Sequence, residues 1–256
     1  MSWQEFWNGD TPIYVNDVHK EVHYRIVAAD LVASLDRESA RVLDYGCGEA
    51  IHADAVAKTC DLLVLCDGSA MTRGRLAARF GNSARIRIAA PEQVETLPTS
   101  SFDIIVVNSV VQYLSQPEFE RLLGAWHRLL APDGRLILGD IIPRTVGPVT
   151  DVVALLRLAR KHRFLTAAGL GLAKTLFSPY RTKRTEIGLL RFDEDELIEL
   201  LARHGFEAYR RPVNIGHNPS RLTAIATPRL QHTGEMPRPH SLVMEQGAGL
   251  PVHSQP

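Results

Sequence analysis

A carboxylate and two glycines follow one another closely in the stretch RVLDYGCGEA, residues 41–50. A short apolar run leads to Asp44, then Gly46 and Gly48 come one residue apart, and a helical pattern begins at once. Because glycine has no Cβ atom, the backbone of such a turn can approach a ligand closely and adopt a positive φ. In an open parallel sheet, ligands bind beyond the carboxyl ends of the strands, commonly at the turn after the first strand. The stretch therefore predicts a ligand-binding turn.

The spacing and charge of this turn favour one kind of ligand. A dinucleotide fingerprint needs a third glycine three residues after the second, where this chain has Ile51, so a nicotinamide oxidoreductase is the least favoured function. Asp44 would repel a phosphate but accept hydrogen bonds from an ammonium group. Asp67 ends the next apolar run, where an acidic side chain reaches a ribose diol, although it could instead cap the following helix. A ribose joined to a cationic amino acid indicates S-adenosylmethionine.

Helical and strand patterns alternate around this turn. Helices are expected at 17–35, 50–60, 70–80, 116–130 and 193–206. Strands are expected at 40–46, 62–67, 84–90, 102–109, 135–142, 207–213 and 221–228, with APDG (131–134) as a turn before the fifth. Strands separated by helices imply right-handed crossovers and a parallel sheet, which the last two strands can close antiparallel. The sequence predicts an α/β fold with a doubly wound, mostly parallel seven-stranded sheet of the Rossmann-like type.

Four stretches together resemble the class I S-adenosylmethionine-dependent methyltransferases. They are VLDYGCGEA, LCDGS, SFDIIVVNSVVQYL and LLAPDGRLILGD, which occur in the family's order within residues 20–227. The resemblance implies that Asp44, Gly46 and Gly48 line the methionine end of the cofactor. It further implies that Asp67 binds the ribose hydroxyls and that Asn108 or its neighbours lie near the sulfonium. Further stretches, YVND and NIGHN among them, are similar to bacterial members that have no assigned acceptor.

The same resemblance suggests further cofactor contacts and shows departures from the family pattern. Members with an N-terminal helix grip the cofactor carboxylate with an Arg, and Arg25 lies at a suitable distance before the turn, although it could be a surface cation. Ala50 stands where the family often has a third glycine. The usual acidic residue for the adenine amine has no clear counterpart in AAPEQVE, which leaves Glu92 or Gln93 as candidates.

A basic segment interrupts the alternation between residues 143 and 191. It carries ten Lys and Arg residues against two acidic residues, within a chain whose net charge is zero. Residues 151–177 mix apolar and cationic positions, which is typical of an amphipathic helical pair. We expect either a cover with solvated cations or a lid for apolar, anionic or membrane-resident acceptors, with peripheral membrane contact through residues 151–184. The balanced total charge gives no reason to expect nucleic acid as a partner.

The sequence suggests a division of the chain into five parts and a cellular location. These are an N-terminal helix and lid (1–36), a cofactor-binding core (37–142), the basic helical insertion (143–191), a C-terminal helix with closing strands (192–228) and a tail expected to be disordered (229–256). An aromatic lid, or a simple packing patch, is expected from Trp3, Trp7 and Tyr14. Three cysteines without disulfide or metal spacing, and an N-terminus unlike a signal peptide, indicate a cytoplasmic protein.

The acceptor chemistry is less defined than the cofactor turn. His217, Tyr113 and Asp140 are candidate catalytic residues because the ends of the fourth and fifth strands and the last turn converge on one rim; Gln112 and His127 are further candidates. No cluster has metal-ligand spacing. The leading hypothesis is an enzyme that passes a methyl group in line from S-adenosylmethionine to a small-molecule acceptor. The alternative is a non-catalytic methyltransferase-like partner subunit or membrane-surface adaptor.

Overall fold

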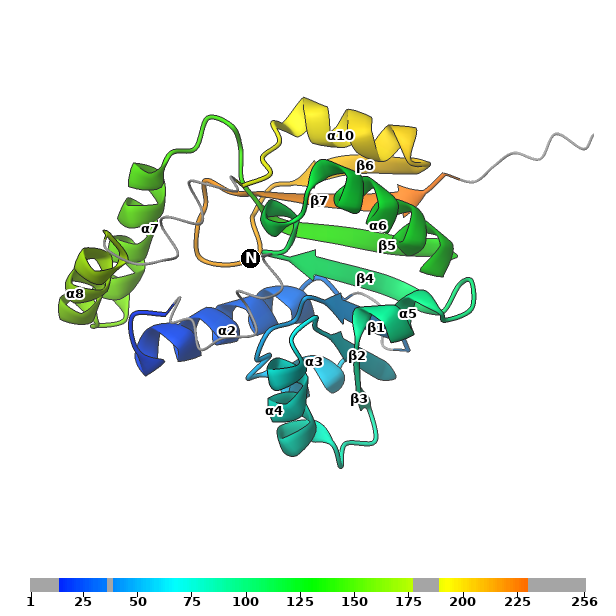
Figure 1. The fold of residues 1–256 in the computed structure, drawn as a ribbon, viewed down its shortest axis with the longest axis horizontal. Helices are drawn as coiled ribbons and strands as arrows, with labels where there is room; N and C mark the ends of the chain where they lie inside the picture. Colours follow the sequence, from blue (N-terminus) through cyan, green and yellow to red (C-terminus); the bar gives the residue numbers. More distant parts are fainter. Residues whose placement is uncertain (1–13, 36–38, 177–188, 230–256) are drawn as a thin grey trace, which may run out of the picture.

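A seven-stranded sheet forms the centre of the protein (Figure 1), in a computed structural model that describes residues 14–35, 39–176 and 189–229. Its order is β3-β2-β1-β4-β5-β7-β6. The strands are β1 (Arg41–Tyr45), β2 (Leu62–Cys66), β3 (Ile86–Ala89), β4 (Phe102–Asn108), β5 (Leu130–Ile141), β6 (Phe206–Arg211) and β7 (Leu222–Pro228). The first five pair in parallel and β7 runs antiparallel to both neighbours. The predicted mostly parallel, doubly wound fold is confirmed.

Helices cover both faces of the sheet, so the central strands are buried on both sides. One apolar cluster joins the sheet to α2 (Asp17–Val32), α3 (Ala53–Ala57) and α4 (Ala70–Phe80). The other joins it to α5 (Pro91–Glu95), η1 (Val111–Tyr113), α6 (Gln116–Leu129) and α10 (Glu194–Arg203). Figure 1 shows these two groups on opposite sides of the strands. This arrangement leaves the carboxyl ends of β1, β2, β4 and β5 at one edge.

Two details of the core differ from the sequence-based expectation. The short helix α5 was not predicted; it begins at Pro91, and the Gln93 side chain accepts a hydrogen bond from Ala90 N at 2.8 Å. The stretch APDG lies inside β5, which runs from Leu130 to Ile141, and is not a separate turn. A register shift against β4 absorbs it, and a Cβ at Gly134 would lie 2.9 Å from Asp103 O. A bulge held tightly against β4 therefore replaces the predicted turn.

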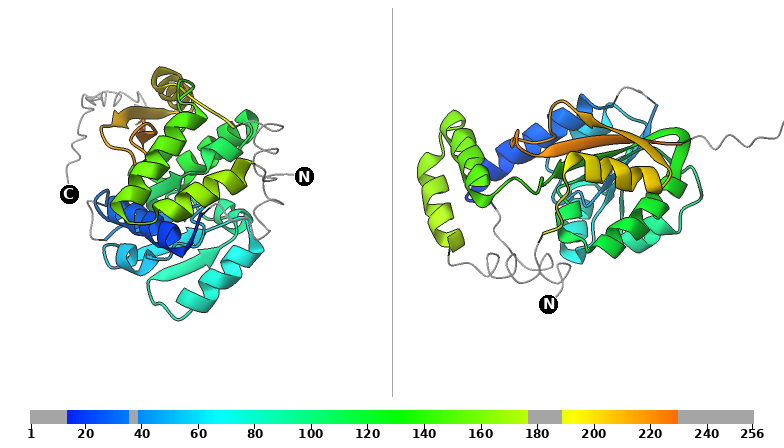
Figure 2. Two further views of the ribbon diagram at one scale, coloured as in Figure 1. Left: turned by 90° about the vertical axis from the view of Figure 1, so that its left-hand side faces the viewer. Right: turned by 90° about the horizontal axis from the view of Figure 1, so that it is seen from above.

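The basic insertion forms two helices beside the carboxyl edge of the sheet. They are α7 (Pro148–Lys161) and α8 (Leu165–Leu176), and they pack on α2 in an apolar cluster that includes Val22, Leu158 and Phe164. Figure 2 shows the pair standing at one end of the molecule, next to α2. No helix in the described ranges has the length and apolar character needed to cross a membrane. Residues 177–188 of the insertion and residues 230–256 of the predicted tail (229–256) lie outside the described residues.

Candidate cofactor and acceptor site

The glycine turn after β1 has the backbone geometry that its sequence predicts. Gly46 and Gly48 have φ values of +78° and +59°, and Ala50 also lies in the left-handed region at +38°. A Cβ at Gly46 would lie 2.2 Å from Val110 Cγ2, and one at Gly48 would lie 2.7 Å from the Tyr24 hydroxyl. Both glycines are therefore required by conformation and by space.

Helix α2 holds the far side of this turn. The Tyr24 hydroxyl accepts a hydrogen bond from Glu49 N at 2.9 Å, and Lys20 forms an ion pair with the Glu49 carboxylate. The helix starts at an N-cap, Asn16, whose side chain accepts from His19 N at 2.9 Å. These contacts fix α2 against the turn, so one face of the helix becomes a wall of the site.

Two carboxylates stand at the strand ends that border the turn. The Asp67 side chain accepts hydrogen bonds from Gly48 N at 3.0 Å and Ser69 N at 2.8 Å, whereas the N-cap of α4 is Ser69. The interpretation of Asp67 as that helix's N-cap is therefore wrong. Burial, and then the charge of Asp67, raise the pKa of Asp44 from 3.8 to about 7. Burial also raises the pKa of Asp67, while the two backbone N–H donors lower it.

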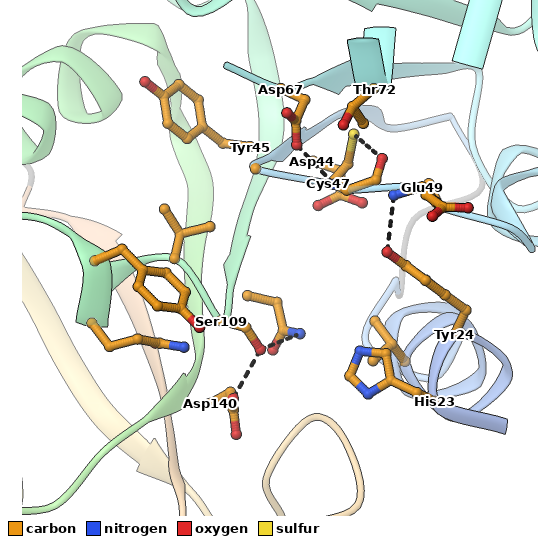
Figure 3. Close-up of a pocket in the computed structure, with 18 of the residues that line it drawn as sticks. His23, Tyr24, Asp44, Tyr45, Cys47, Glu49, Asp67, Thr72, Ser109 and Asp140 are labelled. Carbon is orange, nitrogen blue, oxygen red and sulfur yellow. Dashed lines mark hydrogen bonds between the residues drawn. The ribbon is translucent and has the colours of Figure 1, made fainter. Parts of the chain in front are cut away.

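The two carboxylates open onto one cavity of about 1620 Å³ at the carboxyl edge of the sheet. This volume exceeds the 300–1,000 Å³ of a usual single-ligand pocket, so the cavity has room for a cofactor and a second molecule. In Figure 3 Asp44 and Asp67 lie together at one end, and His23 and Tyr24 of α2 face Ser109 and Asp140 across the other. The site thus has a glycine-turn end and a histidine-bearing end.

Strained residues join the two ends where β4 and β5 stop. Ser109 and Asp140 both have a φ of +58°, an uncommon conformation for residues with a side chain. The Ser109 hydroxyl donates to the Asp140 carboxylate at 2.8 Å. Asn108 Oδ1 is buried and has no hydrogen-bond partner in the described part of the chain, while a Cβ at Gly139 would lie 2.3 Å from it. Asn108 Oδ1 is therefore packed against Gly139 of β5, as a buried acceptor of the kind that is rare in folded proteins.

Five of the six predicted cofactor residues line this cavity, namely Asp44, Gly46, Gly48, Asp67 and Asn108. Arg25 does not: its side chain is exposed and lies near His162, whose pKa it helps to lower. The helical turn explains this correction, because Tyr24 and Ala28 occupy the face of α2 toward the cavity and Arg25 lies about 100° away from Tyr24. The cofactor contact expected of Arg25 is not supported.

Three other candidates also lie away from the cavity. The Gln93 side chain is used to cap α5, and Glu92 is exposed on the first turn of that helix, so neither lines the cavity. His127 packs on Phe206 and its Nε2 lies 3.2 Å from Gly205 O, where β6 begins at the opposite edge of the sheet. The rim position of His127 is therefore wrong, whereas the adenine contact of Glu92 or Gln93 stays a prediction that their positions do not support.

The acceptor candidates His217, Tyr113, Asp140 and Gln112 all line the cavity, as does Tyr14. Trp3 and Trp7 lie outside the described residues. Sequence reasoning missed several lining residues, which are His19, His23, Tyr24, Ser109, Asp151 and Arg221. The four-residue spacing of His19 and His23 places both on one face of α2 and was the available signal. No group of three potential ligands in the described ranges could hold a metal ion.

Fold and site together define a Rossmann-like α/β protein with a nucleoside-cofactor pocket at its strand ends. A family profile described as "Methyltransferase domain" matches residues 43–138. CymA, a probable nonribosomal peptide synthetase of Salinispora arenicola, is 31% identical over 146 residues, which are 55% of this chain and 2% of CymA. The ubiquinone biosynthesis O-methyltransferase of Xanthomonas oryzae is 28% identical over 149 residues, 53% of this chain and 56% of that enzyme.

A solved structure shows the same fold. The Burkholderia thailandensis 1,6-didemethyltoxoflavin-N1-methyltransferase, with S-adenosylhomocysteine bound, superposes with a TM-score of 0.51 at 22% identity and covers 80% of this chain and 78% of its own. The chain spans about half the length of the ubiquinone relative and a small part of CymA. Residues 43–138 of the chain thus match a methyltransferase domain, and the fold is that of the class I S-adenosylmethionine-dependent methyltransferases.

Proposed function

We propose that this chain transfers a methyl group from S-adenosylmethionine to a small-molecule acceptor. The observation that carries the proposal is the glycine turn between two partly buried carboxylates, Asp44 and Asp67, at the end of a cavity large enough for two molecules. A cationic amino acid would relieve the repulsion between these carboxylates, and a phosphate would increase it. The donor set therefore fits S-adenosylmethionine better than a dinucleotide.

Residues at the glycine-turn end would bind the cofactor, and the rest of the cavity would admit the acceptor. Asp44 would accept hydrogen bonds from the ammonium group, Asp67 would bind the ribose diol, and the Gly46–Gly48 backbone would lie against the cofactor. Asn108 lines the cavity at the end of β4, beside Ser109. When bound, S-adenosylmethionine supplies a methyl group activated by its sulfonium. The protein's part is to align the acceptor with that methyl group and to exclude water.

Labelled methyl transfer tests this proposal whatever the identity of the acceptor. The protein is incubated with trideuteromethyl-S-adenosylmethionine and a bacterial metabolite extract, and labelled products are sought by mass spectrometry. We expect at least one labelled small molecule that is absent with the Asp44→Ala variant. Label incorporated only into macromolecules would contradict the small-molecule acceptor.

A second candidate function is binding at a membrane surface, as an adaptor or near a lipid-soluble acceptor. Helices α7 and α8 expose large apolar side chains, with Val149 75% and Leu170 67% exposed. Cations accompany them, namely Arg157, Arg160, Lys161 and Arg163. This combination is typical of helices that lie in a bilayer interface, where each nearby cation contributes about 1 kcal/mol on anionic lipid.

Vesicle co-sedimentation tests the membrane candidate. Phosphatidylglycerol vesicles should retain the protein at low salt, and Leu170→Ser and Arg160→Glu should each weaken retention at least threefold. Val213→Ser is the matched control, because Val213 is 66% exposed and lies outside α7 and α8. Equal retention of all variants, or retention that is insensitive to salt, would reject the contact. Retention together with a failure to bind S-adenosylhomocysteine would favour the non-catalytic adaptor.

We also propose a reducing, cytoplasmic location. Cys47, Cys60 and Cys66 are buried free thiols. Burial raises the pKa of each of them, which keeps them as unreactive thiols. This supports a compartment in which thiols persist.

A further inference from the structure

The histidine-bearing end of the cavity is a preformed chamber whose chemistry differs from that of the glycine turn. We define the histidine chamber by Tyr14, His19, His23, Asp140 and His217, all of which line the cavity. The rings of His19 and His23 each lie 6.2 Å from the ring of His217, edge to face. Tyr14 packs against His19 and His23 at 5.4 Å. The Tyr14 ring before α2, the imidazoles of α2 and the imidazole of the loop before β7 thus enclose one space.

The loop that carries His217 is fixed on both sides of the histidine. Gly216, with a φ of +100°, donates its N–H to the Asp30 carboxylate of α2 at 2.8 Å. On the other side, Asn218 Nδ2 donates to the Asp151 carboxylate of α7 at 3.0 Å. The backbone at His217 is therefore tied to α2 and to α7, and the imidazole is held toward α2 with little freedom.

Buried amides complete this support. Asn214 Oδ1 accepts from Asp140 N at 3.2 Å and from the Thr223 hydroxyl at 2.8 Å, while Asn214 Nδ2 donates to Asn218 O at 3.1 Å. Asn214 and Asn218 are each 6% exposed. The stretch NIGHNPS, which the sequence alone presents as a connection between strands, is thus a rigid support that joins β5, β7 and α7 around one histidine.

The charges of the chamber are compensated by the protein itself. Arg221 lies 2.7 Å from the Asp151 carboxylate, and its charge also lowers the pKa of Asp140 against the larger effect of burial. Lys20, the cation on the neighbouring turn of α2, is paired with Glu49. The cations named here are already matched by carboxylates, so an anionic acceptor would gain little from them.

The histidines are held in the neutral form. Burial lowers the pKa of His23 to about 3 and that of His19 to about 4, and burial together with Arg221 lowers the pKa of His217, against Asp151. A neutral imidazole has one nitrogen that accepts a hydrogen bond. His19 Nδ1 accepts from Val15 N at 3.4 Å, whereas no hydrogen bond within the described ranges involves the ring nitrogens of His23 and His217. The chamber therefore offers acceptors to an uncharged donor.

We infer that the histidine chamber binds an uncharged hydroxyl-bearing acceptor and that His217 accepts the hydroxyl hydrogen, which makes the reaction an O-methylation. This inference rests on the proposed methyltransferase function and specifies its substrate class. In the step, the acceptor oxygen forms a bond to the methyl carbon and the sulfur–methyl bond breaks. The hydroxyl proton passes to the His217 imidazole, and the positive sulfonium becomes a neutral thioether. Charge and atoms balance without a further reactant.

Binding of 4-nitrophenol tests the chamber, because only the phenolate form of this probe is yellow. The probe is titrated at a pH where the free probe is largely phenolate, with and without saturating S-adenosylhomocysteine. We expect it to bind the wild-type protein as the neutral phenol, with loss of the yellow absorbance. Binding as phenolate, or no binding at millimolar probe, would overturn the inference.

Variants at one position separate the role of His217 from a structural one. His217→Phe keeps a ring but removes the acceptor nitrogen, so the affinity for 4-nitrophenol should fall at least tenfold. His217→Gln keeps an acceptor atom and should retain most of the wild-type affinity. His204→Gln, on α10's C-terminal side near Glu120, is the matched control and should bind as wild type. Equal probe affinity in wild type and His217→Phe would overturn the inference.

Cofactor binding is measured on the same samples by calorimetry with S-adenosylhomocysteine. Each His217 variant should bind it within twofold of the wild-type affinity, which also shows that the variant is folded. Loss of S-adenosylhomocysteine binding in the wild type would reject the proposed function. The 4-nitrophenol titration without S-adenosylhomocysteine would still show whether the histidine chamber binds a neutral phenol. Failure of the proposed function and failure of this inference are therefore distinguishable.

Discussion

At the scale of single residues, the glycine turn shows how backbone geometry and charge create a site. Gly46 needs a positive φ and also lies against Val110, while Asp44 is partly buried near Asp67. The residue types and their spacing could be read from sequence, because only glycine fits such positions easily. The contact with Val110 could not, since it depends on how η1 follows β4 in space.

Gly46→Ala should destabilise the protein by about 1–3 kcal/mol, because alanine adds the cost of a positive φ and an overlap with Val110 Cγ2. Urea unfolding measures this change. In the Gly46→Ala, Val110→Ala double variant the overlap is removed. The double variant should therefore be destabilised by less than the sum of the two single effects. Strictly additive single effects would show that Val110 does not oppose the added Cβ.

The raised pKa of Asp44 predicts a pH dependence of stability in the cofactor-free protein. Its folded pKa of about 7 lies above its ordinary value of 3.8, so between these values the folded state binds more protons than the unfolded state. The free energy of unfolding should therefore fall as pH rises from about 4 to 7, by at most about 1.4 kcal/mol per pH unit from this group. Asp44→Asn should flatten the slope; an unchanged slope would show that Asp44 is not the buried acid.

The same ionisation should couple to cofactor binding. An ammonium group beside Asp44 favours the carboxylate, so binding should release a proton and the affinity for S-adenosylhomocysteine should increase from pH 6 to pH 7.5. Calorimetry in two buffers with different ionisation enthalpies measures the proton release. Proton uptake, or affinity that falls over this range, would place the cationic group elsewhere.

At the scale of elements, α2 links the parts of the site that are separate in the sequence. Tyr24 holds the glycine turn, His19 and His23 face the chamber, and Asp30 holds the loop before β7. The helix itself was predictable from its apolar spacing. Its rotation was not, which is why sequence distance points to Arg25 for the cofactor while Tyr24, one residue before it, contacts the turn.

Phe164→Ala tests whether the α7–α8 pair is held in place by α2. Phe164 is 3% exposed and stacks on His19 at 5.4 Å, and removing such a buried ring costs about 3–5 kcal/mol in protein cores. Hydrogen exchange should quicken in α7 and α8 but not in β1 or β4. Leu170→Ala, at an exposed position on α8, is the control. Exchange that quickens equally in β1 would show that the pair is part of the central core.

At the scale of the whole molecule, the sequence predicted the sheet well and the acceptor end in part: His217 and Asp140 were expected there, whereas the histidines of α2 were not. Strand positions and the antiparallel closure followed from local apolar patterns and spacing, which are properties of short segments. The chamber is assembled from residues such as His19, Asp140 and His217, which are brought together only by the complete fold. Long-range placement, such as Gly216 beside Asp30, leaves no local signal in the sequence.

One calorimetric measurement tests the central claim that the cofactor binds between the ends of β1 and β2. Wild-type protein titrated with S-adenosylhomocysteine should bind one equivalent, and Asp67→Ala should weaken binding at least tenfold because the ribose loses its carboxylate. Asp61→Ala, at an exposed position just before the opposite end of β2, should bind as wild type. No binding to the folded wild-type protein, or equal affinity in Asp67→Ala, would contradict the account.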